Sequence, residues 1–375
     1  MSRGAADRGR PWQHRLDRVV GIPLVWALGR LRRRRRCPPR RVRRLGLLQL
    51  NAIGDTILCT PLVQALGRAY PDAEIVLAHG STNAEAAALL PAVDRRLPLS
   101  VARPDRAIAR LRRERLDVLI DLGPWPRISA LLALGSGARF VIGFRTPGQA
   151  RHGGFDRAVP HSSRRHEWRN IAALGAALGV RVAGPPRLGE QTTAPLPPLP
   201  RAPFVVLHPW AGGLRHTWKE WPGARWVALG RWLRARGYAL VVSGGPGDRA
   251  RSDALAARLR GEGDGERVQV LAGEASLASM TRVLVRAAAL VTVNTGIMHL
   301  GAALDIPLVA LHGPTRVSRW GPLGTRSVAL ASRTPGCPYL HLGFEYGGRR
   351  SDCMEGIALE TVTGALEGLL PRRGG

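Results

Sequence analysis

The chain has 375 residues, of which 45% are hydrophobic, and it carries a formal net charge of +29 at pH 7. This length leaves room for two ordinary domains with sizeable cores. No apolar run approaches the ~20 residues that a membrane-spanning helix needs, and the N-terminus lacks the pattern of a signal peptide. The composition therefore predicts a globular protein, and neither a membrane span nor a signal peptide is expected.

The positive charge comes almost entirely from arginine. Lysine occurs once, at Lys219, so 55 of the 56 basic residues are arginine. A GC-biased genome, indicated by the abundance of Ala, Arg, Gly, Pro and Val, raises arginine for reasons unrelated to function. A lone lysine indicates a position where a compact ammonium suits better than a planar guanidinium, with chance as the alternative. A basic surface attracts nucleic acid, phosphorylated ligands or anionic lipid, and charge alone does not choose among them.

Four cysteines form no CxxC pair and no His/Cys cluster at zinc spacing: Cys37, Cys59, Cys337 and Cys353. We therefore expect free thiols in a reducing compartment and no structural metal.

Residues 1–44 differ from the rest of the chain. The stretch RLDRVVGIPLVWALGRLRRRRR places apolar residues, among them Trp26, beside an arginine run. This combination is typical of a helix that lies in the interface of an anionic membrane. The alternatives are a disordered basic arm and a helix packed on the protein.

Beyond residue 44, short apolar runs alternate with helical patterns. The first set of predicted strands covers 45–50, 73–78, 118–123 and 139–144, and the second covers 204–209, 238–245, 268–273, 289–296 and 307–314. Near-continuous apolar strands separated by helices favour parallel sheets covered on both faces. The chain is therefore predicted to be α/β, with two doubly wound, Rossmann-like domains.

A segment dense in proline, residues 186–203, is the clearest linker. It separates an N-terminal domain at 45–185 from a C-terminal domain at 204–356, and a helix at 357–375 follows. Open α/β sheets bind ligands beyond the carboxyl ends of their strands. Two such domains facing each other would form a cleft lined by those ends.

The stretch NAIGDTILCTP places Asp55 where the first strand meets a helix. Gly54 permits a tight turn, and Asp55 then either caps the helix or acts as a general base for an attacking hydroxyl. The spacing and the GK[ST] ending of a phosphate-binding P-loop are absent.

Three further strand ends carry polar or glycine-rich loops. In HPWAGGLRHTWKEWP, Gly212 and Gly213 allow close approach to a ligand, and Lys219 offers a point charge to a phosphate. SGGPGDRA, with Gly244 and Gly245, suits phosphate or ribose contacts but lacks a dinucleotide fingerprint. The third loop, VNTGIMHLGAAL, opens a helix whose N–H groups favour an anion, and it contains Asn294, Thr295, Gly296 and His299.

These blocks, AIGDTILCTPLVQAL, HPWAGGLRHTWKEWP and VNTGIMHLGAALDIPLVALHGPT, resemble in order and separation the glycosyltransferase family 9 heptosyltransferases of lipopolysaccharide synthesis. The similarity covers most of residues 45–366. It implies a GT-B fold, an acceptor on the N-terminal domain, a nucleotide-sugar on the C-terminal domain, and inverting transfer without a metal. It also implies that the last helix crosses back to the first domain.

The resemblance also assigns roles to residues. Asp55 matches the catalytic base, with Gly54 and Thr56 on the acceptor side, and Lys219 matches the lysine that binds the diphosphate. The segment at 294–299 matches the region around the donor's diphosphate and sugar. Ser276 and Leu277 fall near the nucleobase, where Gly212, Gly213, Gly244 and Gly245 would also contact the nucleotide.

One position departs from the family. Asn294 stands where these enzymes usually carry aspartate, which leaves the sugar of an ADP-heptose-like donor open. We expect a monomeric glycosyltransferase with a glycan or glycolipid acceptor, peripheral on the inner face of the cytoplasmic membrane through residues 1–44. The alternatives are a sugar-nucleotide epimerase or hydrolase of the same fold and a basic nucleic-acid-binding protein, although no nucleic-acid module is present.

Overall fold

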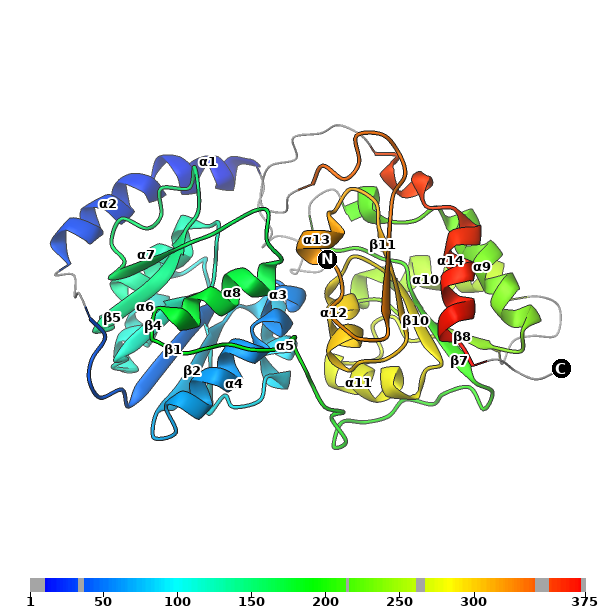
Figure 1. Ribbon diagram of the computed structural model, residues 1–375, viewed down its shortest axis with the longest axis horizontal. Helices are drawn as coiled ribbons and strands as arrows, with labels where there is room; N and C mark the ends of the chain where they lie inside the picture. Colours follow the sequence, from blue (N-terminus) through cyan, green and yellow to red (C-terminus); the bar gives the residue numbers. More distant parts are fainter. Residues whose placement is uncertain (1–10, 33–36, 214–215, 261–266, 341–350, 372–375) are drawn as a thin grey trace. The chain divides into compact units, whose positions relative to one another are not determined.

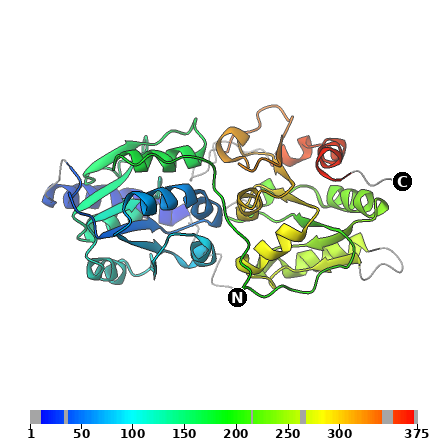
Figure 2. The same cartoon turned by 60° about the horizontal axis from the view of Figure 1, so that its bottom comes forward.

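The computed structural model describes residues 11–32, 37–213, 216–260, 267–340 and 351–371. The chain divides into two compact units between Pro186 and Arg187. Each unit holds one six-stranded parallel sheet with helices on both faces (Figures 1 and 2). The predicted α/β class with two doubly wound sheets is confirmed.

The sheet of the first unit has the strand order β3-β2-β1-β4-β5-β6. Its order reverses between β1 and β4, so the carboxyl ends of these two strands form the switch point where ligands bind in such sheets. The strands are β1 (Arg44–Gln49), β2 (Glu74–His79), β3 (Arg95–Pro98), β4 (Val118–Asp121), β5 (Phe140–Arg145) and β6 (Arg157–Pro160).

The helices of the first unit cover both faces of this sheet. α6 (Pro104–Arg113) and α7 (Arg127–Gly135) pack on one face with alternate residues of the strands. α4 (Thr60–Ala69) and α8 (Glu167–Ala176) contact each other on the opposite face. The short α3 (Ile53–Leu58), η2 (Ser81–Asn83) and α5 (Ala84–Leu89) follow β1 and β2.

The described part of residues 1–44 is helical. α1 (Pro11–Val19) and α2 (Gly21–Leu31) pack on the first unit, with α2 in contact with α7 (Figure 1). Among the residues that the structure describes, no helix is long and apolar enough to cross a bilayer.

The second unit repeats the architecture with the strand order β12-β11-β10-β7-β8-β9, and its switch point lies between β7 and β10. α9, α10 and α14 pack on one face of the sheet, and α12 packs on the other. The strands are β7 (Phe204–His208), β8 (Ala239–Val242), β9 (Val268–Val270), β10 (Ala289–Val293), β11 (Leu308–His312) and β12 (Ser327–Ala331). The helices are α9 (Gly223–Ala235), α10 (Arg249–Leu259), α11 (Leu277–Arg286), α12 (Gly296–Ala303), α13 (Val317–Trp320) and α14 (Leu359–Leu369), with 3-10 turns η3 (His216–Lys219), η4 (Pro246–Asp248) and η6 (Cys353–Gly356).

All nine predicted strands are present, and the described residues contain three further strands that were not predicted. β3, β6 and β12 are outer strands of their sheets. β3 and β6 are short, with the sequences RRLP and RAVP, and their residues are exposed or half-buried. An edge strand needs apolar residues only where a helix covers it, so these segments lack the apolar run by which the others were recognised.

The proline-rich linker and the last helix both belong to the second unit. Leu188 donates its backbone N–H to the Ala303 carbonyl, and Gln191 donates to the Thr281 hydroxyl. α14, for which a crossing to the first domain is expected, buries Val362 and Leu366 in the core of the second unit.

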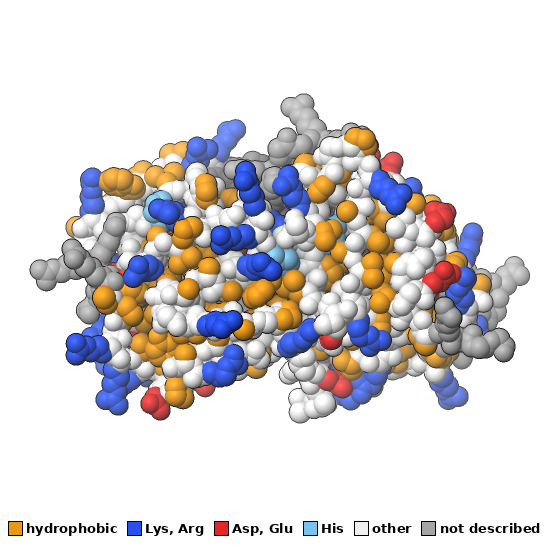
Figure 3. Space-filling model, viewed as in Figure 1, with side chains coloured by type: hydrophobic (Ala, Val, Ile, Leu, Met, Phe, Trp, Pro, Cys, Tyr) orange, Lys and Arg blue, Asp and Glu red, His pale blue; other side chains and the backbone are white. Residues whose placement is uncertain are grey.

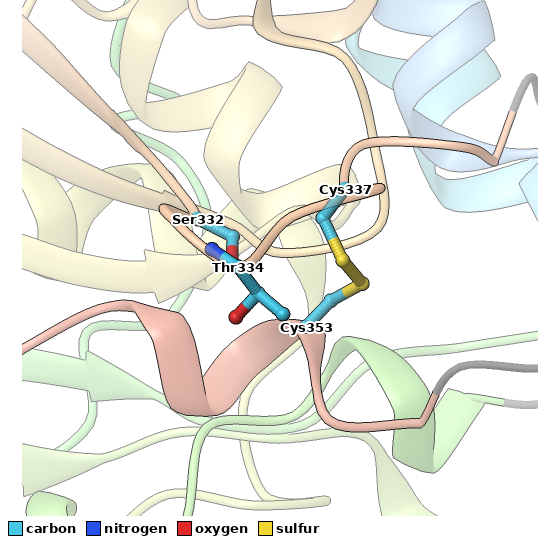
Figure 4. Close-up of a disulfide and its surroundings, with 4 residues drawn as sticks. All are labelled: Ser332, Thr334, Cys337 and Cys353. Atoms are coloured by element: carbon cyan, nitrogen blue, oxygen red, sulfur yellow. A yellow bond between two sulfur atoms is a disulfide. The ribbon is translucent and has the colours of Figure 1, made fainter.

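The expectation of four free thiols is wrong. Cys337 and Cys353 form a disulfide (Figure 4), whereas Cys37 and Cys59 are free. The two half-cystines lie 16 residues apart in sequence, on the loop after β12 and on η6. Packing brings these segments together, since Arg333 donates its N–H to the Gly356 carbonyl. Only two of the four cysteines are therefore free thiols, which removes half of the support for the predicted reducing compartment.

Reduction of this disulfide is expected to destabilise the second unit. A cross-link that closes a ring of this size stabilises a fold by about 3 kcal/mol in the chain-entropy description. Calorimetry with and without dithiothreitol measures the effect, and thiol titration of the denatured protein should rise from two to four. Cys37→Ser, which leaves the disulfide intact, is the control. An unchanged melting temperature after complete reduction would contradict the expectation.

Candidate functional site

Asp55 lies in the first turn of α3, directly after β1. Its side chain is half-buried, and β1 is one of the two strands at the switch point of the first sheet. The carboxylate also helps to raise the pKa of the buried Cys59 thiol, an effect caused mainly by burial of the sulfur. Asp55 is therefore placed where a bound ligand is expected, on a turn anchored by the sheet.

The turn before Asp55 differs from the prediction. Gly54 has a helical backbone within α3, and the left-handed residue is Ala52, with φ of 66°. Thr56 is fully buried, and its hydroxyl donates to the Ala52 carbonyl at 2.8 Å and accepts from Asn83 Nδ2 at 2.8 Å. Thr56 thus fixes the turn that carries Asp55.

A buried ion pair, not predicted from the sequence, lies at the end of β4. Asp121 and Arg151 are both fully buried and paired, and Ser129 donates its hydroxyl to Asp121. Burial raises the pKa of the Asp121 carboxyl, and the charge of Arg151 opposes this rise. The available signal was an aspartate inside the apolar run VLIDLG, while the arginine-rich composition concealed Arg151.

A pocket of about 540 Å³ opens at the carboxyl ends of β5 and β6. His161, buried in its wall, lies 3.0 Å from Glu167 through Nε2 and packs edge-on against Phe144. The pocket is lined by Arg145, Thr146, Pro147, Gly148, Ala150, His152, Pro160 and His161. The pocket and Asp55 share the carboxyl edge of one parallel sheet.

In the second unit, every predicted donor-binding residue lies at the carboxyl edge of the sheet. Asn294, Thr295, Gly296 and His299 follow β10, and Gly212, Gly213 and Lys219 follow the adjacent β7. Gly244 and Gly245 follow β8, and Ser276 and Leu277 follow β9. The fold thus gathers four separate motifs at one edge.

Lys219 ends η3 and is 8% exposed. Its Nζ donates to the Gly212 carbonyl at 2.7 Å, and the adjacent Gly213 has φ of 88°, a conformation that favours glycine. The ammonium is therefore held on the loop after β7, beside the switch point.

A charged network braces the Lys219 loop and was not predicted. Glu220 accepts from the Ala211 N–H at 3.1 Å and pairs with Arg251 at 2.9 Å. Arg251 also pairs with Asp248, which accepts from the Gly245 N–H at 2.8 Å. The loops after β7 and β8 are consequently tied together, and Gly244 and Gly245 belong to this brace.

Thr295 is the N-cap of α12, with an extended backbone and its hydroxyl 3.4 Å from that of Thr292. Asn294, Thr295 and Gly296 are half-buried, whereas His299 is 5% exposed. The first N–H groups of a helix have no partner within it, and the helix dipole favours an anion there.

Two predicted nucleobase contacts have structural roles. Ser276 caps α11, where its hydroxyl accepts from the Ser279 N–H at 3.1 Å. Leu277 is 7% exposed. A contact to a ligand at this position therefore falls to the backbone rather than to the leucine side chain.

His208 ends β7 and is nearly inaccessible to solvent. Nδ1 lies 2.9 Å from the Ser243 hydroxyl. Burial lowers the pKa of this imidazole from 6.5 to about 4, with Arg251 contributing and Asp248 opposing. His208 is therefore neutral near pH 7 and packs as an uncharged group.

Acidification is expected to weaken the second unit through His208. Below pH 6.5 the unfolded chain protonates this histidine while the folded chain does not, so stability falls as the pH approaches 4. Between pH 7 and 5 the loss is about 2 kcal/mol from this group. Denaturant unfolding of the native protein and His208→Gln at both pH values measures the difference. Equal pH dependence in the two proteins would contradict the lowered pKa.

Among the residues that the structure describes, no three His, Cys, Asp or Glu side chains are grouped to hold a metal ion.

Two doubly wound sheets, each with polar or charged groups at its switch point, are the architecture of the GT-B class, in which ligands bind at the carboxyl ends of the strands. Residues 105–342 match the model of glycosyltransferase family 9 (heptosyltransferase). The chain is 31% identical over 322 residues to lipopolysaccharide heptosyltransferase 1 of Pseudomonas aeruginosa. This alignment covers 79% of this chain and 86% of that relative. The chain belongs to glycosyltransferase family 9 and is a glycosyltransferase.

Solved structures agree on the fold. ADP-heptose lipopolysaccharide heptosyltransferase II of E. coli superposes with a TM-score of 0.70 at 21% identity, over 87% of this chain and 98% of that chain. The iron-containing dodecameric glycosyltransferase TibC of enterotoxigenic E. coli superposes with a TM-score of 0.54 at 15% identity, over 88% of this chain and 77% of that chain. The expected GT-B fold is confirmed.

Proposed function

We propose that this enzyme transfers a heptose or similar sugar from a nucleotide-sugar to a hydroxyl of a lipid-linked glycan, with inversion and without a metal. Asp55 is the general base, and Lys219 with the start of α12 stabilises the leaving diphosphate. The observation that carries the proposal is the position of these groups, each at the switch point of its sheet.

Inverting transfer is a single displacement. The acceptor oxygen attacks the anomeric carbon, its proton passes to a base, and the bond to the diphosphate breaks. A half-buried carboxylate on a fixed turn, as at Asp55, suits the base. The departing diphosphate gains charge, which a lysine ammonium and helix N–H groups stabilise.

The donor is assigned to the second unit and the acceptor to the first. The ADP-heptose named for the E. coli structural relative fits the loops after β7, β8, β9 and β10 in chemical character. The pocket of Arg145, His152 and His161 suits a polar acceptor glycan. We place the monomeric enzyme on the cytoplasmic face of an anionic membrane, which it reaches through residues 1–44.

Metal independence rests on the basic groups at the donor edge, because an ammonium and a helix terminus can carry leaving-group charge without a cation. TibC is iron-containing, so the point calls for direct measurement. Transfer that persists after exhaustive dialysis against EDTA would support it, and loss that is restored by one metal would overturn it.

A thermal-shift screen with ADP-, GDP-, UDP- and dTDP-sugars tests the donor class. We expect one nucleotide series to stabilise the protein, and transfer assays with that series and a lipid-linked glycan to give product with inverted anomeric configuration. Turnover of the nucleotide-sugar alone, with no acceptor, would indicate an epimerase or hydrolase and overturn the proposal.

Asn294→Asp should change the choice of sugar. Asparagine offers an N–H donor that aspartate lacks, so different sugar hydroxyls are bound. We expect the ratio of kcat/KM for ADP-heptose to that for another accepted donor to shift by about tenfold or more. Affinity for the free nucleoside diphosphate, which lacks the sugar, reports separately how far the added negative charge affects the diphosphate site at the start of α12. An unaltered ratio would show that residue 294 does not contact the sugar.

A further inference from the structure

α1 and α2 expose more large apolar side chains than the rest of the described chain together. Six of the eight exposed large hydrophobic residues lie on these helices or at their junction, with exposures from 44% at Val20 to 84% at Leu31. They are Leu16, Val19, Val20, Leu24, Trp26 and Leu31. We call these six residues the apolar face. Water normally meets the polar side of a surface helix, so the concentration of exposed apolar side chains on this helix pair indicates a partner.

The opposite side of α2 is packed tightly against the first unit. Val25 is fully buried in the core that includes α6 and α7. A methyl group on Gly21 would lie 2.7 Å from Arg127 Cβ, and one on Gly29 would lie 2.7 Å from the Gly153 carbonyl oxygen. The helix pair is therefore fixed on the unit, and the apolar face keeps its orientation relative to the sheet below it.

Polar contacts anchor both ends of the pair. The Asp17 carboxylate accepts from the backbone N–H groups of Arg127 and Ile128, at 2.9 and 3.1 Å, and so caps α7. Arg32 pairs with Asp156 at 2.6 Å and donates to the Ala138 carbonyl at 2.8 Å.

The contact of Asp17 with α7 is also connected by hydrogen bonds to the pocket at the ends of β5 and β6. Arg127 pairs with Asp17 at 3.2 Å and donates Nε to the Gln149 carbonyl at 2.9 Å. Gln149 lies between Gly148 and Ala150, which line the pocket. Two hydrogen-bonded steps thus connect the helix pair with the loop proposed to receive the acceptor.

Basic residues border the apolar face. Arg15, Arg18 and Arg30 are exposed, and the Arg30 guanidinium lies 4.5 Å from the centre of the Trp26 ring. Figure 3 shows hydrophobic and basic side chains side by side along the edge where α1 and α2 lie in Figure 1. Tryptophan and arginine beside aliphatic residues suit the level of lipid headgroups.

We infer that the apolar face inserts into the headgroup region of an anionic lipid monolayer and that the Asp17–Arg127–Gln149 link fixes the acceptor pocket relative to that surface. The inference rests on the proposed function and deepens it. The arm named there becomes a docking surface built into the fold, in which aliphatic insertion and arginine attraction act together. The charge of the border favours anionic lipid over a second copy of this basic chain.

The test compares vesicle binding by the full-length protein with that of Leu24→Glu/Leu31→Glu. Vesicles of phosphatidylcholine with phosphatidylglycerol contain no acceptor, so the result does not depend on catalysis. We expect the double variant to bind more than about tenfold more weakly. Binding by the native protein should keep a component that resists high salt, because inserted apolar side chains are not screened. Val285→Glu and Leu196→Glu, at the two exposed apolar residues outside the helix pair, are matched controls.

Equal binding by the double variant, or complete release of the native protein by salt, would overturn insertion. A native dimer that Leu24→Glu/Leu31→Glu converts to a monomer, without vesicle binding by either protein, would identify a second copy as the occupant and also overturn insertion.

Asp17→Asn tests the link to the pocket. We expect unchanged vesicle binding and a raised KM for a lipid-linked acceptor in vesicles, with nucleotide affinity unaffected. An unchanged KM would remove the link from the inference. If the proposed function fails and the vesicle result holds, the docking surface stands by itself.

Discussion

Asp55→Asn is expected to lower kcat by about 10²–10⁴-fold, the range by which a positioned general base accelerates a reaction. The amide keeps the shape of the carboxylate but cannot take the proton of the acceptor hydroxyl. Donor affinity should persist, because the diphosphate contacts are assigned to the other unit. Steady-state transfer and calorimetric titration with the nucleoside diphosphate separate the two effects.

The control for Asp55 is an aspartate at the start of another helix. Asp105 lies in the first turn of α6 in the same unit, and its side chain is exposed. Asp105→Asn removes the same charge from a helix start, so it reports the cost of losing a favourable dipole interaction alone. Normal turnover in Asp55→Asn, or an equal loss in both variants, would exclude Asp55 as the base.

Lys219→Ala is expected to weaken nucleoside diphosphate binding by about tenfold to a hundredfold, as the loss of a charged hydrogen bond predicts. The loss in kcat/KM should be larger, about 10²–10³-fold, since the diphosphate gains charge as the bond to the sugar breaks. Titration calorimetry and transfer assays measure the two quantities. Lys219→Arg should retain only part of the nucleoside diphosphate affinity and of kcat/KM, because a planar guanidinium does not reproduce the close contact of the ammonium with the Gly212 carbonyl.

Arg326→Ala serves as the control for charge. Arg326 is exposed and directly precedes β12, so it lies at the amino edge of the same sheet, away from the loops that carry Lys219. A general electrostatic attraction of the donor would be reduced equally in the two variants, whereas a specific contact would be lost only at position 219. Unchanged nucleotide binding by Lys219→Ala would remove this residue from the donor site.

The sequence alone was sufficient for the buried strands and for the loops that follow them. A strand covered on both faces is apolar along most of its length, as FVVLH and ALVTV are, so it is visible without a structure. Glycines, Lys219 and Asn294 then mark the loops, because a ligand at a strand end requires close backbone approach and charge. These features predicted the fold and the edges that carry the candidate site.

Contacts between distant segments were decided only by the tertiary structure. The Cys337–Cys353 disulfide and the Asp121–Arg151 pair each join residues that no local pattern relates. The left-handed turn at Ala52 in place of Gly54 depends on how β1 enters α3.

The N-terminal helices show the same division. Composition predicted a membrane-interfacial helix in residues 1–44, with a disordered basic arm and a helix packed on the protein as the alternatives. It could not assign the buried side, since Val25 and Leu24 are equally apolar in sequence. Packing of Gly21 and Gly29 against the first unit buries Val25 and leaves Leu24 and Leu31 exposed. The sequence determines which residues are apolar. Only the tertiary structure decides which of these apolar residues are buried in the protein and which remain exposed on its surface.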